Sequence, residues 1–247
     1  MATSVRDAEA RLAVPPHPGR FSPSEVLGIP DTAATMLTAA IESGTPLAAA
    51  ARIKMRGWIR IKGWLPFRAS QVIAPGRGFV WAARVAGLIE GHDLFVDGAG
   101  EMEWKLMRLF AVARGSGTDV SRSAAGREAG EAFWLPTALL PRFGVEWTAT
   151  PDGQAVARVP TSTETVDVTY DLNPLGRVES IAFQRWGDPG GTGSFALRSF
   201  GGTMRDHRTF DGVTIPTRGS VGWHFGERNW TSGEFFRFQI TDLRLVR

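Results

Sequence analysis

The sequence predicts a mainly β protein of the α+β class, in which one antiparallel curved sheet forms a β-barrel or half-barrel. An N-terminal helix and one helical insertion are expected to accompany this sheet. Apolar and polar residues alternate over long stretches: Ile53, Met55, Ile59 and Ile61 are apolar, and the residues between them are mostly basic. A period of two is typical of a strand with one buried face. Turn residues recur about every ten positions, as an antiparallel sheet or barrel requires.

Two short helices are expected before the first strand. Residues 1–20 combine charged residues with a proline-rich stretch, and we expect them to form a flexible tail. Residues 22–25 resemble a capping box that opens a short helix. Asp31 is a good N-cap for a second helix that runs to about Ser43, and Gly44 supplies its C-terminal stop. This second helix would pack against the sheet or close one mouth of a barrel.

The rest of the chain reads as strands interrupted by one helical segment. A meander of about five strands is expected from Ile53 to Phe110. The alternation stops in a helical insertion at about residues 118–141. Strands then resume to the C-terminus, at residues 146–148, 155–159, 165–170, 178–186, 193–200, 203–210, 214–225 and 234–243. Because both halves alternate in the same way around the insertion, we expect residues 21–247 to form a single domain.

Composition excludes several classes of function. The chain has no cysteine, which excludes disulfides and cysteine-based zinc sites and fits a cytoplasmic location. Residues 1–20 lack the apolar core of a secretory signal, and no stretch is long enough to span a membrane. The formal net charge is only +3 and no nucleic-acid-reading motif occurs, so we expect no nucleic-acid partner. The acidic residues 93–103 lack the oxygen spacing of a calcium loop, and we expect neither metal nor cofactor.

Tryptophan is the most informative residue type in the chain. There are nine tryptophans, and each buried indole needs a partner for its N–H group. Packing within an ordinary core would account for any single one. As a set they predict an apolar cavity, which is the usual ligand site of a barrel. The expected ligand-binding indoles are Trp81, Trp104, Trp134 and Trp223.

Polar residues beside these indoles are the candidate catalytic groups. Arg127 and Glu131 share one face of the predicted helix at a spacing of four residues. They either form a surface ion pair or lie at the cavity, where Arg127 would bind the ligand and Glu131 would act as a general acid or base. His92 or His207 would be the second proton-transfer group, paired with a carboxylate across strands.

Two further arginines interrupt apolar runs on the predicted strands. If Arg84 and Arg185 point inward, they would hold an anionic group of the ligand. If they point outward, they are solvated side chains.

Several motifs resemble an uncharacterised bacterial family, DUF6544, which has a DUF6920 relative. The motifs run from about residue 50 to residue 245: Trp64-x-Pro66-Phe67-x-Ala69-x-Gln71, Gly78-Phe79-x-Trp81-x-Ala83, Gly98-x-Gly100-x-Met102, Arg127-x3-Glu131, Trp134-x-Pro136-x3-Leu140, Val145-x-Trp147, Phe210-x-Gly212-x2-Ile215-Pro216 and Val221-x-Trp223. The resemblance implies a β-rich shape that binds a lipid or other ligand, similar to the half-barrel of lipoprotein carriers. It implies no established activity, and those carriers are exported.

One departure from the family pattern bears on the ligand. Members of the family have Arg-Tyr-Leu-x-Glu in the helical insertion, where this chain has Arg127-Glu128-Ala129-Gly130-Glu131. The arginine and the terminal glutamate are retained and the aromatic residue is lost. The ligand of this chain therefore need not be the one that other members bind.

The sequence favours binding of an apolar small molecule in a tryptophan-lined pocket. One hypothesis is a cofactor-independent cyclase or isomerase of specialised metabolism, acting on a polyketide- or terpenoid-like substrate that the barrel holds in a reactive shape. The alternative is a non-catalytic carrier of a lipid or hydrophobic metabolite. A structural or partner-binding module is a third hypothesis, which predicts no enclosed cavity. The sequence does not decide the oligomeric state.

Overall fold

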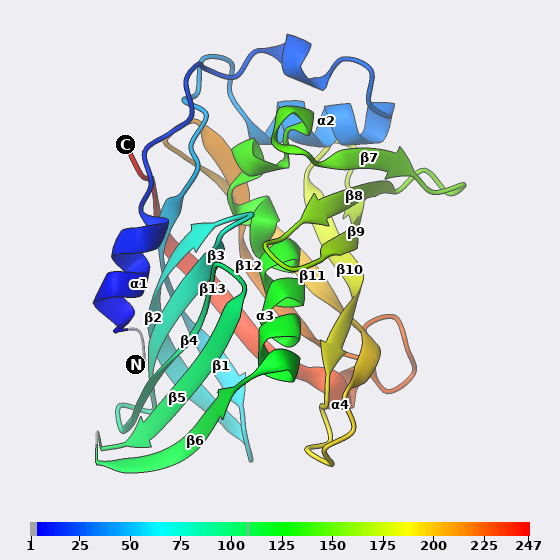
Figure 1. The fold of residues 1–247 in the computed structure, drawn as a ribbon. Helices are drawn as coiled ribbons and strands as arrows, with labels where there is room; N and C mark the ends of the chain where they lie inside the picture. The colour runs from blue at the N-terminus through cyan, green and yellow to red at the C-terminus, as the bar shows by residue number, and fades with distance from the viewer. Residues whose placement is uncertain (1–3, 108) are drawn as a thin grey trace.

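A single antiparallel sheet of 13 strands dominates the computed structural model, which describes residues 4–107 and 109–247 (Figure 1). The strands follow the order β6-β5-β4-β3-β2-β1-β13-β12-β11-β10-β9-β8-β7. The two edge strands are therefore β6 and β7, and the sheet is an open half-barrel. This confirms the predicted mainly β class with a curved antiparallel sheet.

The first half of the sheet is a meander in which each strand pairs with the next. Its strands are β1 (Ala51–Arg60), β2 (Trp64–Ala74), β3 (Gly78–Val85), β4 (Ile89–Val96), β5 (Ala99–Leu106) and β6 (Phe110–Ser116). The sequence predicted about five strands here and missed β6. Six of the seven residues of β6 are exposed, so this edge strand lacks the alternation on which the prediction depended.

The second half starts at the other edge and returns to the first strand. Its strands are β7 (Glu146–Ala149), β8 (Ala155–Pro160), β9 (Thr165–Leu172), β10 (Val178–Gly187), β11 (Ala196–Phe210), β12 (Val213–Trp223) and β13 (Glu234–Leu245). Strand β13 pairs with β1 and so joins the two halves. The two strands expected at 193–200 and 203–210 are one strand, β11, which continues through Gly201 and Gly202.

Helices cover one end and both faces of the sheet. The predicted helix at Asp31 is α2 (Asp31–Ala40), which packs near one end of the half-barrel against β12, β7 and β8. The predicted insertion contains α3 (Thr118–Glu131), followed by three short 3-10 turns. A short α4 (Trp230–Gly233) precedes β13.

The N-terminal segment is more ordered than the sequence predicts. Helix α1 (Val5–Leu12) begins after Ser4, whose side chain accepts a hydrogen bond from the backbone N–H of Asp7. Ala8 and Leu12 are buried against the outer face of β2, β3 and β4. The spacing of these two apolar residues is too brief a pattern to stand out in a charged segment. Residues 5–12 thus belong to the folded structure, although they were expected to lie in a flexible tail.

Helix α3 lies along the concave face of the sheet, between β3–β6 on one side and β9 and β10 on the other (Figure 1). Small residues allow this close approach. A Cβ atom added to Gly130 would lie 2.4 Å from the ring of Phe183 on β10, and one added to Gly126 would lie 3.1 Å from Cγ of Arg185. The side of α3 that faces β10 is therefore restricted to small residues, and position 130 to glycine.

None of the helices in the described part of the chain is long and apolar enough to cross a membrane.

The two glycines of α3 give a matched test of this packing. Gly130→Ala is expected to destabilise the protein by about 1–3 kcal/mol, because the added methyl group meets a buried aromatic ring. Gly126→Ala is expected to stay within about 1 kcal/mol of wild type, because the gain in helix propensity offsets a small shift of a flexible arginine. Urea unfolding followed by tryptophan fluorescence measures both free energies. Equal losses in the two variants would contradict the proposed packing.

Candidate functional site

An apolar cavity of about 170 Å³ lies between α3 and the inner face of the sheet. Its apolar side chains come from the turn that follows α3 and from six strands. The side chains are Ile59, Trp81, Phe133, Trp134, Ile181, Phe183, Phe200, Met204, Val221, Phe235, Phe236 and Phe238. Four charged residues, Asp93, Arg127, Glu131 and Arg185, complete the lining.

The cavity is small and dominated by aromatic rings. The ring centres of Trp81 and Phe236 are 5.9 Å apart, and those of Trp134 and Phe238 are 5.2 Å apart. Both pairs make edge-to-face contacts. An apolar protein cavity of roughly 150 Å³ accommodates a benzene molecule. The cavity therefore has room for one ring or a short alkyl chain in the conformation described here.

Arg127 of α3 connects three elements on one side of the cavity. Its Nε donates to Oε1 of Glu131 at 2.7 Å, and its Nη1 donates to Oδ2 of Asp93 on β4 at 3.0 Å. The other oxygen of Glu131 accepts from Nε2 of Gln71 on β2 at 2.5 Å. The other oxygen of Asp93 accepts from the indole of Trp104 at 2.9 Å. Both carboxylates are thus fully engaged, and the network ties α3 to the first half of the sheet.

The surroundings of Arg127 favour its charged form. Desolvation is the largest influence and would lower the pKa of Arg127, but the charges of Glu131 and Asp93 outweigh it and raise that pKa above its ordinary value. The guanidinium carbon also lies 4.4 Å from the ring centre of Phe79 and 5.2 Å from that of Trp81. The Arg127–Glu131 pair is thus an ion pair that lines the cavity instead of an exposed one, and the ligand-binding role of Arg127 stays a prediction.

Arg185 of β10 is the second cation at the cavity, and no carboxylate that the structure describes pairs with it. Its Nε donates to the backbone oxygen of Ser123 at 3.1 Å, and its guanidinium lies over Phe200 and Trp223. Its two terminal nitrogens make no hydrogen bond to any residue within the described ranges. The side chain keeps intermediate exposure where it lines the cavity, yet burial is the main cause that lowers the pKa of Arg185 to about 10, with repulsion from Arg127 second.

The predicted tryptophans divide into two groups. Trp81 and Trp134 line the cavity directly, and the structure describes no hydrogen-bond partner for either indole N–H. Trp104 packs behind Trp81, with the two ring centres 5.6 Å apart, and its indole N–H orients Asp93 through a hydrogen bond. Trp223 packs edge-to-face on Phe200 at 5.0 Å. The last two therefore support lining residues.

The other predicted site residues lie away from the cavity. His92 is on the outer face of the sheet, paired with Ala82 and Glu103. His207 lies near α2, where burial first and Arg177 second lower its pKa. Arg84 is also on the outer face, in an ion pair with Glu90.

The structure brings neither histidine to Glu131, so the proposed proton-transfer pair is not assembled inside the cavity. Catalytic roles for Glu131, His92 and His207 stay predictions.

Several residues that line the cavity, and Gln71, which binds the lining residue Glu131, were not predicted as site residues. Gln71 and Asp93 are polar residues on inward-facing strand positions, and that interruption of an apolar face was the available signal. The phenylalanines at 183, 200, 235, 236 and 238 carry no motif and are assembled only by strand pairing. Within the described ranges no three His, Asp or Glu side chains are grouped as a metal site would require.

A buried carboxyl group that the sequence did not single out lies one turn away on α3. Glu128 is 4% exposed, and its carboxyl group is directed at the backbone N–H groups of residues 76–78 without reaching hydrogen-bond geometry. Burial raises the pKa of Glu128 to about 8, and these N–H groups offset part of that effect.

The model of DUF6544, a family of unknown function, matches residues 19–235. No curated protein matches.

Two solved structures of other families are similar in shape. A LolA superfamily protein of Nitrosomonas europaea is 12% identical, with 86% of this chain and 93% of that chain covered and a TM-score of 0.44. A DUF1329 family protein of Desulfovibrio piger is 11% identical, with 87% and 90% covered and a TM-score of 0.39.

Glu128→Gln is expected to change how stability depends on pH. Because the folded-state pKa is raised from 4.5 to about 8, the stability that Glu128 contributes is full below about 4.5 and is lost as the pH rises through about 8. The variant, which cannot ionise here, should match wild type at low pH and exceed it by a few kcal/mol at high pH. Urea unfolding across this range measures the difference. Glu179→Gln, at an exposed position, is the control and should run parallel to wild type.

Proposed function

Because the chain belongs to DUF6544, a family of unknown function, we propose its function from the cavity: it binds and carries a small amphipathic molecule. The apolar part of this molecule occupies the cavity under α3, and its acidic head lies at Arg185. The observation that carries the proposal is an aromatic cavity with an arginine in its wall that pairs with no carboxylate among the described residues.

The lining selects an apolar group. Twelve of the lining residues are apolar, and transfer of a methylene group from water to such surroundings yields about 0.8 kcal/mol. Water inside an apolar cavity of this size finds too few polar partners to be held well. An apolar group that displaces solvent from this space therefore binds favourably.

Arg185 selects the head group. Asp93 and Glu131 are already bound to Arg127, Gln71 and Trp104, so neither is free to turn toward Arg185. The terminal N–H groups of a guanidinium form a fork that matches a carboxylate or phosphate. A ligand with one acidic head would supply the acceptors that the protein does not.

A carrier function explains the hydrogen bonds of these charged residues better than a catalytic function does. Both oxygens of Glu131 and of Asp93 accept hydrogen bonds, and one bond of each carboxylate ties α3 to the sheet, which is a structural arrangement. Proton transfer would require one of them to release a partner. The cyclase or isomerase hypothesis would gain support from turnover that Glu131→Gln abolishes.

The cavity predicts how affinity depends on ligand length. For a series of straight-chain carboxylic acids, affinity should rise about fourfold per methylene group until the cavity is full, and then level off. Val221→Phe adds a ring to the cavity wall and should weaken the best ligand at least tenfold. Titration calorimetry measures both effects. Leu175→Phe, on an exposed turn, is the matched control, and equal weakening in the two variants would refute the cavity as the binding site.

Arg185→Gln tests the head group. The change should weaken a carboxylic acid by about tenfold, which is the worth of a charge-assisted hydrogen bond. The alcohol of the same chain length should lose less than about threefold, because it carries no charge. Arg158→Gln removes a distant exposed arginine and should change neither affinity. Equal losses for acid and alcohol would show that Arg185 does not bind the head.

A further inference from the structure

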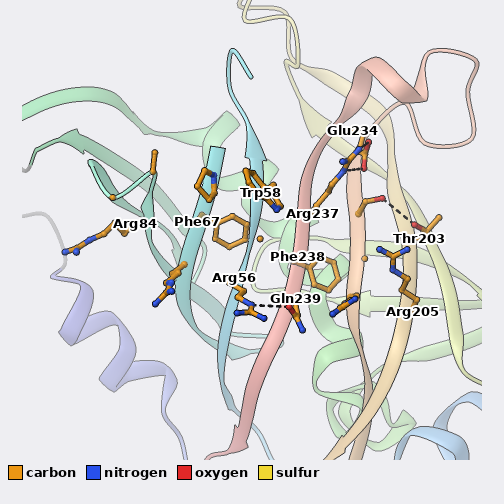
Figure 2. Close-up of a pocket in the computed structure, with 18 residues that line it drawn as sticks. Arg56, Trp58, Phe67, Arg84, Thr203, Arg205, Glu234, Arg237, Phe238 and Gln239 are labelled. Atoms are coloured by element: carbon orange, nitrogen blue, oxygen red, sulfur yellow. Dashed lines mark hydrogen bonds and ion pairs between the residues drawn. The ribbon is translucent and has the colours of Figure 1, made fainter. Parts of the chain in front are cut away.

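A row of arginines crosses the outer face of the sheet, on the side opposite the cavity (Figure 2). Strand register places Arg84 of β3 opposite Arg68 of β2, and Arg68 opposite Arg56 of β1. Gln239 of β13 follows, because it pairs with Arg56 on one side and with Arg218 of β12 on the other. Arg218 in turn pairs with Arg205 of β11. Five arginines and one glutamine thus form one line across six adjacent strands, about 24 Å long at the usual strand spacing.

The arginine row destabilises the sheet, and its positive charge is only partly neutralised by neighbouring carboxylates. Like charges directly opposite each other on a sheet are destabilising, and the row contains three such pairs. Arg84 is paired with Glu90, Arg218 lies 3.3 Å from Asp206, and Arg56 donates to Gln239 at 3.1 Å. Arg68 and Arg205 make no hydrogen bond or ion pair with any residue that the structure describes. All five arginines are exposed, and their side chains border a hollow of about 1140 Å³.

Exposed apolar side chains gather at one end of the sheet, where four β-hairpins turn. The hairpins β1–β2, β3–β4, β5–β6 and β10–β11 all turn at this end (Figure 1). Ten large apolar side chains are exposed in the described residues, and eight of them lie here. Ile61, Leu88, Leu109 and Phe110 at the hairpin tips are 57–75% exposed. Isolated exposed apolar residues are ordinary, but a group on adjacent hairpin tips marks an interaction site.

We propose that this end and the arginine row together bind the surface of a bilayer that contains anionic phospholipids. Leu88 lies four residues beyond Arg84, and Ile61 lies five beyond Arg56, which places the tips about 13–17 Å from the row along the strands. Apolar groups of peripheral proteins enter the boundary between head groups and acyl chains by about 5–10 Å. The row then lies within about one Debye length of the lipid phosphates, where its arginines attract them.

The two features together favour a bilayer over other polyanions. A nucleic acid would account for the arginines but gives the apolar hairpin tips no partner. A bilayer accounts for both. The surface also serves the proposed carrier, because Ile59 and Phe235, which line the cavity, lie in strand ends next to these hairpins. The membrane contact itself does not rest on the carrier function and is tested separately.

Co-sedimentation with vesicles tests the proposal. Wild type should bind vesicles of phosphatidylcholine mixed with phosphatidylglycerol, bind pure phosphatidylcholine far less, and dissociate as salt is raised. Arg68→Gln combined with Arg205→Gln should weaken binding to the mixed vesicles by roughly 10- to 30-fold. Arg142→Gln combined with Arg158→Gln removes the same charge elsewhere and should weaken binding to the mixed vesicles by less than about threefold. Leu88→Ser combined with Phe110→Ser should weaken binding about tenfold.

Further measurements separate the alternatives. Thermal unfolding should show that loss of Arg68 and Arg205 leaves stability unchanged or slightly higher, since like-charge contacts are removed. Carboxylic-acid affinity of this variant should equal that of wild type, so failure of the membrane proposal is distinguishable from failure of the carrier function. Equal losses in the two arginine double variants would overturn the proposal. So would row-dependent binding of a single-stranded oligonucleotide without vesicle binding, or burial of the hairpin tips in a dimer.

Discussion

Arg127 holds helix α3 inside the half-barrel, and the cavity exists because the helix is held there. The guanidinium bridges Glu131 on the helix to Asp93 on β4, while Gln71 on β2 binds the second oxygen of Glu131. The side chains of Arg127, Glu131 and Asp93 are 16–29% exposed, so their desolvation is partial and their mutual attraction is correspondingly moderate. Removal of any partner would leave a charge in an apolar wall.

The opposite side of α3 is held by shape instead of charge. Gly126 and Gly130 let the helix approach β10, and Phe183 fills the space that a side chain would otherwise take. The helix is thus fixed on one side by directional hydrogen bonds and on the other by contact. Between the two, aromatic and aliphatic side chains from β11, β12 and β13 meet without closing the space completely. That residual space is the cavity, and Arg185 at its wall retains the hydrogen-bonding capacity that packing leaves unused.

Local pattern was sufficient to predict most of the fold and part of the site. Alternation identified the central strands, and the four-residue spacing of Arg127 and Glu131 indicated a pair on one helix face. The signal at Asp31 located α2, although Asp31 is the first residue of this helix and Pro30 is its N-cap. Strand β6 and helix α1 were missed because an exposed edge strand and a short helix carry weak periodicity. Asp93 reaches Arg127, and Gln71 reaches Glu131, only through the order of β2, β3 and β4, which no local pattern encodes.

The cavity and the arginine row depend on the same strands, since successive residues of a strand face opposite sides. On the inner face, Phe67, Gly57, Phe238, Gly219 and Met204 form a row across β2, β1, β13, β12 and β11. Each is the sequence neighbour of one member of the outer row. Core packing constrains only the inner residue of each pair of neighbours. At the outer position, any polar side chain would be compatible with the core.

A sheet with alternating charges at the outer positions would be more stable than one with adjacent arginines. Neither the core nor the cavity accounts for the outer row. Its explanation therefore lies in a partner outside the chain, and the positive charge and the apolar tips beside it indicate the chemistry of that partner.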